Sequence, residues 1–181
     1  MPHSILILAG SPRKNGNSEI LADAFSAGAR EAGNAVRKIR LCELKLEHCR
    51  ACDYCRSHAG QCILKDEMNV VYDALKAADV LVFATPIHFF TVSTLLKTAI
   101  DRLYNKPLRD ALPIRQTVFL SVCADHGLET FQPAIDTYRA IDTYLGWQDC
   151  GVITVPDVAE KAAIAGNPAL EQARELGKRF V

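Results

Sequence analysis

Four of the seven cysteines in this sequence crowd into one short stretch. Cys49, Cys52, Cys55 and Cys62 lie within fourteen residues, with two, two and six residues between successive members. Thiolates at these spacings can bind the iron atoms of a single 4Fe–4S cluster, with Cys62 as the fourth ligand. Four sulfurs also suit zinc, although structural zinc sites usually present two separated pairs of ligands. The pattern favours a cluster over zinc and leaves free thiols as the other alternative.

A second stretch with chemical potential is the polar loop at residues 10–18, which separates an apolar run from an amphipathic segment. A strand, a polar loop and a helix N-terminus together form an anion site, because unpaired backbone N–H groups and the helix dipole point at one spot. The side chains that add donors or charge to this loop are Ser11, Arg13, Asn15, Asn17 and Ser18.

The loop lacks the glycine and lysine spacing of nucleotide-hydrolysing proteins and the three glycines of dinucleotide-binding proteins. It therefore favours a terminal phosphate monoester that is held and not cleaved. The alternative is a plain turn in which Asn17 or Ser18 only caps the following helix.

Five apolar or half-apolar runs predict the strands that position these loops, at residues 5–9, 34–42, 80–84, 117–123 and 147–155. Amphipathic segments alternate with them, which predicts an α/β fold with a doubly wound, five-stranded parallel sheet and helices on both faces. The expected strand order is 2-1-3-4-5, and the expected domain is a single one spanning residues 1–181.

In such a sheet a ligand binds beyond the carboxyl ends of the strands, where the strand order reverses. The loops at residues 10–18, 85–90 and 124–129 should therefore meet at one site. The cysteine-rich loop at 43–65 follows the second strand and is expected at the same edge. Residues 104–115 are interpreted as a plain connection at the far end of the sheet, and 156–166 as an irregular return.

Composition excludes several classes of function. The 21 basic and 21 acidic residues give no net charge, which argues against nucleic acid or an anionic membrane as a partner. No apolar run is long enough to span a bilayer, and the first residues lack the pattern of a signal peptide, so we expect a cytoplasmic protein. Cys42, Cys123 and Cys150 fall on predicted strands and are interpreted as small core residues.

The sequence resembles a known family at several of these positions. Residues 10–13 (Gly-Ser-Pro-Arg), 16–18 (Gly-Asn-Ser) and 85–87 (Thr-Pro-Ile) resemble the NADPH-dependent FMN reductase branch of the flavodoxin superfamily. The four clustered cysteines resemble the compact motif of the iron–sulfur flavoproteins in that branch. The resemblance implies a flavodoxin-like fold, FMN as cofactor, a 4Fe–4S cluster, NAD(P)H as a possible donor, and a homodimer or homotetramer.

The resemblance also implies which residues contact the flavin. The phosphate would lie on Ser11, Arg13, Asn15, Asn17 and Ser18. The ring would lie against Pro86, Ile87, His88 and Phe89, with Ala124, Gly127 and Glu129 closing the other side. Cys49, Cys52, Cys55 and Cys62 would hold the cluster, and no side chain need act as a catalytic acid or base because the flavin carries the redox chemistry.

His88 departs from the family, whose members commonly have a tyrosine there. A protonated histidine beside the flavin could favour the reduced, anionic ring and raise its potential, whereas the simpler interpretation is an exposed histidine that leaves the potential alone. Two functions are favoured: an NAD(P)H-dependent FMN or quinone reductase acting on small-molecule or protein redox partners, and a non-enzymatic flavodoxin-like carrier taking electrons from ferredoxin-type donors. A third, a binding module that senses iron or oxygen through a labile cluster, is disfavoured because no segment resembles a DNA-reading helix. The neutral charge favours the enzyme.

Overall fold

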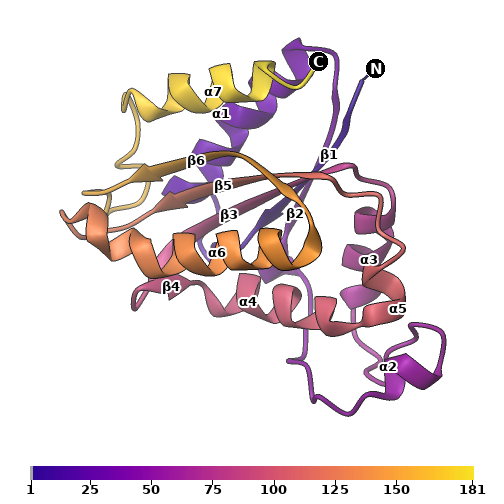
Figure 1. The fold of residues 1–181 in the computed structure, drawn as a ribbon. Coiled ribbons are helices and arrows are strands. Elements are labelled where there is room, and N and C mark those ends of the chain that lie inside the picture. Colours follow the sequence, from indigo (N-terminus) through magenta and orange to yellow (C-terminus); the bar gives the residue numbers. More distant parts are fainter. Residues whose placement is uncertain (1) are drawn as a thin grey trace.

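The computed structural model describes residues 2–181, which form one twisted sheet between two layers of helices (Figure 1). The sheet order is β2-β1-β3-β5-β6, and these strands run parallel to one another. Their bounds are Ser4–Ala9 for β1, Ala35–Arg40 for β2, Val80–His88 for β3, Gln116–Val122 for β5 and Gln148–Val155 for β6.

The structure adds one strand that the sequence analysis missed. β4, Thr91–Val92, pairs antiparallel with the end of β3, so the sheet has six strands. The observed order, β2-β1-β3-β5-β6, therefore differs from the predicted 2-1-3-4-5. The extra strand shifts the numbers of the two strands that follow it. A strand of two residues is too short to produce a recognisable alternation, which is why the pattern did not predict it.

The helices divide between the two faces of the sheet. α1, Asn17–Glu31, and α7, Ala169–Lys178, cover one face (Figure 1). α3, Met68–Lys76, α4, Thr94–Asp101, and α6, Gln132–Leu145, cover the other. The alternating side chains of β1 supply both cores, with Ile5 and Ile7 facing α1 and α7 and with Leu6 and Leu8 facing the opposite layer.

Close packing of α1 against α7 depends on two glycines. A Cβ on Gly28 would lie 1.8 Å from the carbonyl oxygen of Arg174, and one on Gly177 would lie 2.2 Å from that of Phe25. Neither position can hold a larger residue unless the helices separate. This contact fixes α1, whose N-terminus carries the predicted anion site.

Short helical turns occur where the sequence predicts loops. They are η1, Leu41–Glu43, α2, Tyr54–Ser57, η2, Arg102–Tyr104, α5, Lys106–Arg109, and η3, Leu128–Phe131. The interpretation of residues 104–115 as a plain connection is wrong, because Asn105 Oδ1 accepts from the Leu108 N–H and starts α5 there. The prediction that Cys42 lies on a strand is also wrong, since β2 ends at Arg40 and Cys42 belongs to η1.

Among residues 2–181, no helix combines the length and the apolar character needed to cross a bilayer.

Candidate functional site

A cavity of about 400 Å³ lies beyond the carboxyl ends of β1, β3 and β5. Eight of the twelve residues predicted to contact the cofactor line it: Ser11, Arg13, Asn17, Ser18, Pro86, Ile87, His88 and Ala124. The structure therefore brings three predicted loops together at the predicted edge of the sheet. Four predicted residues do not line the cavity: Asn15, Phe89, Gly127 and Glu129.

The N-terminus of α1 opens on this cavity without a side-chain cap. Gly16 is the N-cap residue and has no side chain to cap the helix, so the alternative in which Asn17 or Ser18 caps the helix is wrong. The backbone N–H groups of Asn17 and Ser18 have no partner among the described residues. Two free N–H groups at the positive end of a helix fifteen residues long form a site for an anion.

The turn before α1 is fixed by hydrogen bonds within the loop. Ser11 Oγ accepts from the Arg13 N–H at 3.1 Å, and the Arg13 carbonyl accepts from the Gly16 N–H at 3.1 Å. The exposed Asn15 has a left-handed backbone, with φ of 54°, and its N–H points away from the cavity to Glu19. This explains why Asn15, predicted as a phosphate contact, does not line the cavity.

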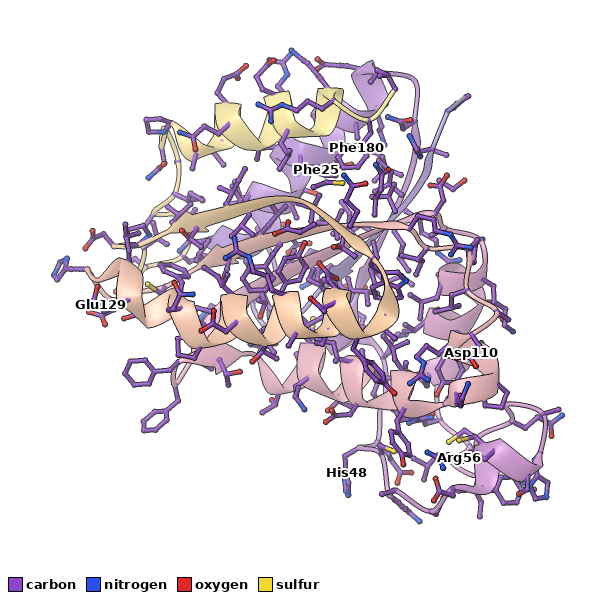
Figure 2. All side chains as sticks on the ribbon, viewed as in Figure 1. Phe25, His48, Arg56, Asp110, Glu129 and Phe180 are labelled. Atoms are coloured by element: carbon purple, nitrogen blue, oxygen red, sulfur yellow. The ribbon has the colours of Figure 1, made fainter. Side chains whose placement is uncertain are left out.

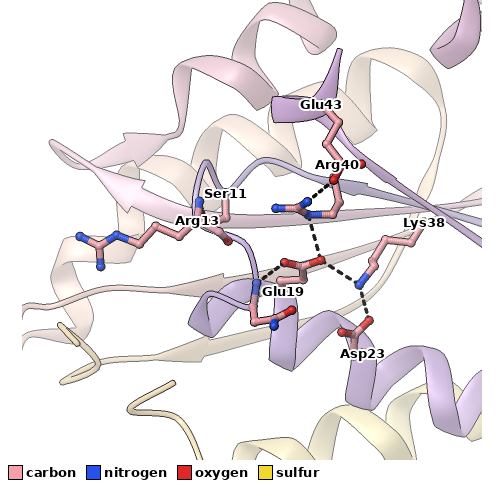
Figure 3. Close-up of polar contacts among 8 residues, drawn as sticks. Ser11, Arg13, Glu19, Asp23, Lys38, Arg40 and Glu43 are labelled. Atoms are coloured by element: carbon pink, nitrogen blue, oxygen red, sulfur yellow. Dashed lines mark hydrogen bonds and ion pairs between the residues drawn. The ribbon is translucent and has the colours of Figure 1, made fainter. Parts of the chain in front are cut away.

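Glu19, in the first turn of α1, is a buried carboxylate that binds the loop on the side facing away from the cavity (Figure 3). It accepts from the Asn15 N–H at 2.7 Å and from Lys38 Nζ at 3.1 Å, and it pairs with Arg40 Nε at 3.1 Å. Burial alone would raise the pKa of Glu19, but the hydrogen bonds from Lys38 and Asn15 and the two cationic charges lower it overall. Lys38 and Arg40 of the edge strand β2 therefore hold the loop at residues 10–18 through the ionised carboxylate of Glu19.

The return after β6 forms a wall of the cavity that the sequence analysis missed. Val158, Ala159 and Lys161 line the cavity. Asn17 holds this return in place, since its Nδ2 donates to the carbonyls of Val158 and Glu160, both at 2.8 Å, and its Oδ1 accepts from the Ile164 N–H at 3.2 Å.

These bonds occupy the side chain of Asn17, so only its backbone N–H is free to contact a phosphate. Lys161 adds a second cation beside Arg13, whose Nη1 donates to the Ala159 carbonyl at 3.2 Å. One signal could have identified this wall: residues 156–166 follow the last strand, and the carboxyl ends of all parallel strands lie at the same edge.

The turn between β3 and β4 places His88 at the cavity and turns Phe89 away from it. Phe89 and Phe90 have left-handed backbones, with φ of 51° and 67°, as a tight two-residue hairpin requires. Phe89 is 96% exposed and contacts the ring of Phe90 edge to face. The side chain of Phe89 therefore lies outside the cavity, contrary to the prediction.

The loop after β5 contributes Ala124 but not its later residues. η3 begins at Leu128 and turns the chain outward, which leaves Glu129 exposed at one end of the molecule (Figure 2). The Glu129 carboxylate folds over Gly127, where a Cβ would lie 2.3 Å from its Oε1. Gly127 and Glu129 therefore contact each other and not the cavity.

The cysteine loop lies away from this cavity, contrary to the prediction that it shares the same edge. No described residue lines both the cavity beyond β1, β3 and β5 (the flavin-sized cavity) and the cavity among the cysteines. Figure 1 shows α2 beside α5, and Figure 2 shows sulfur atoms near Arg56, on the opposite side of the molecule from Glu129. The chain leaves β2 at the predicted edge but then runs back to the far end of the sheet.

Segment 102–105 is what holds the loop there. Asn105 Nδ2 donates to the Gly60 carbonyl at 2.7 Å, and the Tyr104 hydroxyl accepts from Arg56 Nη2 at 2.8 Å. Arg102 donates to the carbonyl of Glu47 at 2.9 Å and forms a bidentate ion pair with the Asp66 carboxylate, at 2.8 and 3.1 Å. Because Glu47 precedes and Asp66 follows the cysteines, Arg102 ties the two ends of the loop together.

All four clustered cysteines line one small cavity of about 20 Å³, together with Arg102 and Tyr72. Ala51 and Asp53 have left-handed backbones and flank Cys52, which turns the chain between the first three cysteines. Burial and then the neighbouring thiols, Cys62 first, raise the pKa of Cys55. Across residues 2–181, no three His, Cys, Asp or Glu side chains are arranged so that they could hold a metal ion.

Comparisons with known proteins agree with this geometry. A family described as NADPH-dependent FMN reductase matches residues 3–146. An iron–sulfur flavoprotein of Methanocaldococcus jannaschii is 28% identical over 188 residues, which cover 97% of this chain and 94% of that protein. An iron–sulfur flavoprotein of Archaeoglobus fulgidus is 30% identical over 96 residues, and the match spans only 43% of its length and 53% of this chain. The NAD(P)H:quinone oxidoreductase of Methanothermobacter marburgensis has the same fold, with a TM-score of 0.78 at 19% identity over 100% of both chains.

Proposed function

This chain belongs to the NADPH-dependent FMN reductase family, and we propose that it uses FMN to pass electrons from NAD(P)H to a small-molecule or protein acceptor. The match confirms the expected family, and membership supports the expected class of enzyme, a flavin oxidoreductase. The observation that carries the proposal is the uncapped N-terminus of α1, where the N–H groups of Asn17 and Ser18 are free beside Arg13.

The cavity fits FMN in size and in the chemistry of its walls. Its volume of about 400 Å³ lies within the range of cofactor sites. The phosphate would accept from the two free N–H groups and pair with Arg13 and Lys161, while Ser11 orients the turn. Pro86, Ile87, His88 and Ala124 would frame the ring. Bound FMN supplies hydride and electron transfer, and these residues orient it.

We further propose that Cys49, Cys52, Cys55 and Cys62 bind a 4Fe–4S cluster. Two observations support this: all four cysteines line the same cavity, and a buried arginine nitrogen at that cavity, Arg102 Nε, has no hydrogen-bond partner. Thiolates are the ligands that such clusters require. Because the cavity is only about 20 Å³, the loop must move outward to admit the cluster. The helix α2 has no buried residue that would oppose this movement.

The two proposed sites lie at opposite ends of α4. Ser93, just before α4, donates to the carbonyl of Gly10 beside the flavin-sized cavity, and Arg102, just after it, lines the cysteine cavity. A helix of eight residues is about 12 Å long. We propose that the chain forms a homodimer or homotetramer. The exposed Phe89 and Leu128, which follow β3 and β5 in the chain, are side chains that such an assembly could cover.

Steady-state oxidation of NADH and NADPH, with FMN or a quinone as acceptor, tests the proposed activity. We expect turnover with at least one nucleotide, and we expect it to fall when Arg13→Ala weakens FMN binding. Arg37→Ala, on the edge strand β2 and outside both cavities, is the matched control and should leave turnover unchanged. A yellow, FMN-loaded protein that oxidises neither nucleotide would refute the enzyme and favour an electron carrier.

A further inference from the structure

Arg102 is the one buried side-chain cation among the residues described at the cysteine cavity. Its side chain is 2% exposed, although arginine is rarely buried without a specific partner. Its Nη1 and Nη2 atoms both have partners, in the carbonyl of Glu47 and the two oxygens of Asp66. Its Nε has no hydrogen-bond partner, so one N–H of a buried, charged group is left unpaired.

A buried donor without a partner is costly, and native structures rarely keep one. The hydrogen bonds to Asp66 and Glu47 fix the guanidinium plane, and with it the direction of the Nε–H. Arg102 and the four cysteines line the same cavity. Cys62 lines this cavity together with Arg102 and the neighbouring Tyr72, whose hydroxyl donates to the Arg102 carbonyl at 3.3 Å. The missing partner of Nε is therefore to be sought in that cavity.

We propose that Arg102 is a positioning residue of the cysteine site: its Nη atoms hold the two ends of the loop, and its Nε–H donates to a sulfur of the cluster that the four cysteines bind. This inference rests on the proposed cluster. Sulfur carries much of the negative charge of a thiolate-bound cluster, so a fixed N–H donor at this point stabilises the cluster more when it is reduced. Reduction adds one electron, taken from an external reductant such as dithionite, and no bond is made or broken.

The test compares two variants that both lack the ion pair between Arg102 and Asp66. Asp66→Asn removes the negative partner and keeps Arg102, whereas the double variant Asp66→Asn, Arg102→Met also removes the guanidinium without leaving a buried charge unpaired. After anaerobic reconstitution with iron and sulfide, the reduction potential of each cluster is measured by EPR-monitored titration.

We expect the double variant to have the lower potential. The ratio of reduced to oxidised cluster at a given potential should fall at least tenfold relative to Asp66→Asn, about 59 mV for a one-electron couple. Asp66→Asn alone should shift the potential upward from the unmodified protein. Arg56→Met, which removes an exposed arginine of the loop itself that bonds Tyr104, should match the unmodified protein closely.

A merely structural role for Arg102 predicts a different result, in which the two variants share one potential although the double variant also loses the bond to Glu47. That result would overturn the inference and leave the proposed cluster standing. If the unmodified protein takes up no iron, the proposed cluster fails and the inference fails with it. A folded double variant that takes up no iron, when Asp66→Asn does, would support the part of the inference in which Arg102 holds the loop, since the two proteins differ only at Arg102.

Discussion

Glu19 gives the sharpest test of how the anion loop is held. It is 4% exposed, accepts hydrogen bonds from the Asn15 N–H and Lys38 Nζ, and forms an ion pair with Arg40 Nε. Glu19→Gln keeps the shape of the side chain but removes its charge and turns one acceptor into a donor. Lys38 and Arg40 keep a second acidic partner each, in Asp23 and Glu43, so neither is left buried and unpaired.

The expected loss follows from these contacts. Hydrogen bonds to charged groups contribute about 1.5–3 kcal/mol each, and glutamine can keep only part of the set, so we expect Glu19→Gln to cost about 2–4 kcal/mol in the free energy of unfolding near pH 7. Urea unfolding measures this directly. Glu43→Gln is the matched control: its side chain is 62% exposed and also pairs with Arg40, so it should cost less than about 1 kcal/mol.

The pH dependence has a definite sign. The pKa of Glu19 in the folded protein lies below its ordinary value of 4.5, so the ionised carboxylate stabilises the fold above that pH. This contribution is lost as the pH falls from 4.5 through the lower, folded pKa. The difference between the unmodified protein and Glu19→Gln should therefore shrink in acid. Equal stability near neutral pH, or a gap that persists unchanged in strong acid, would refute the reasoning.

Three further predictions concern other parts of the chain. Burial raises the pKa of Asp142 from 3.8 to about 6, which corresponds to about 3 kcal/mol at 1.36 kcal/mol per unit. The free energy of unfolding should therefore fall as the pH rises across that interval. Thermal melts should show this fall for the unmodified protein and not for Asp142→Asn. Gly177→Ala should lower the melting temperature, because its Cβ would press on Phe25 and overpacking costs about 1–3 kcal/mol, whereas Gln172→Ala on the exposed side of α7 should not. His88→Tyr should leave the flavin midpoint potential unchanged in a redox titration, because His88 is exposed and its ring makes no hydrogen bond to another described residue. A change in the midpoint potential that occurs only at acid pH would instead assign His88 a tuning role.

The parts of the site that the sequence predicts are those set by local chemistry. The buried run of β1, the polar turn after it and the start of α1 follow one another in the chain, so their types and order suffice to place Ser11, Arg13 and Ser18 at an anion site. The ends of β3 and β5 join them because parallel strands end at a common edge.

The parts that the sequence does not predict depend on contacts between distant residues. Lys161 reaches the cavity because the side chain of Asn17 holds residues 158–164, more than 140 positions away in the chain. The cysteine loop lies at the far end because Arg102, which looks like an exposed charge at the end of an amphipathic helix, pairs with Asp66. Phe89 turns outward because a two-residue hairpin forces a left-handed backbone on a residue that rarely adopts it.

The affinity of the protein for FMN, compared with its affinity for riboflavin, tests the central claim most directly. The two ligands differ only in the phosphate, for which the free N–H groups of Asn17 and Ser18 and the charges of Arg13 and Lys161 are available. At about 1.5–3 kcal/mol for each charge-assisted hydrogen bond, FMN should bind at least about 100-fold more tightly than riboflavin by fluorescence titration. Equal affinities for the two, or no binding of FMN at all, would contradict the account.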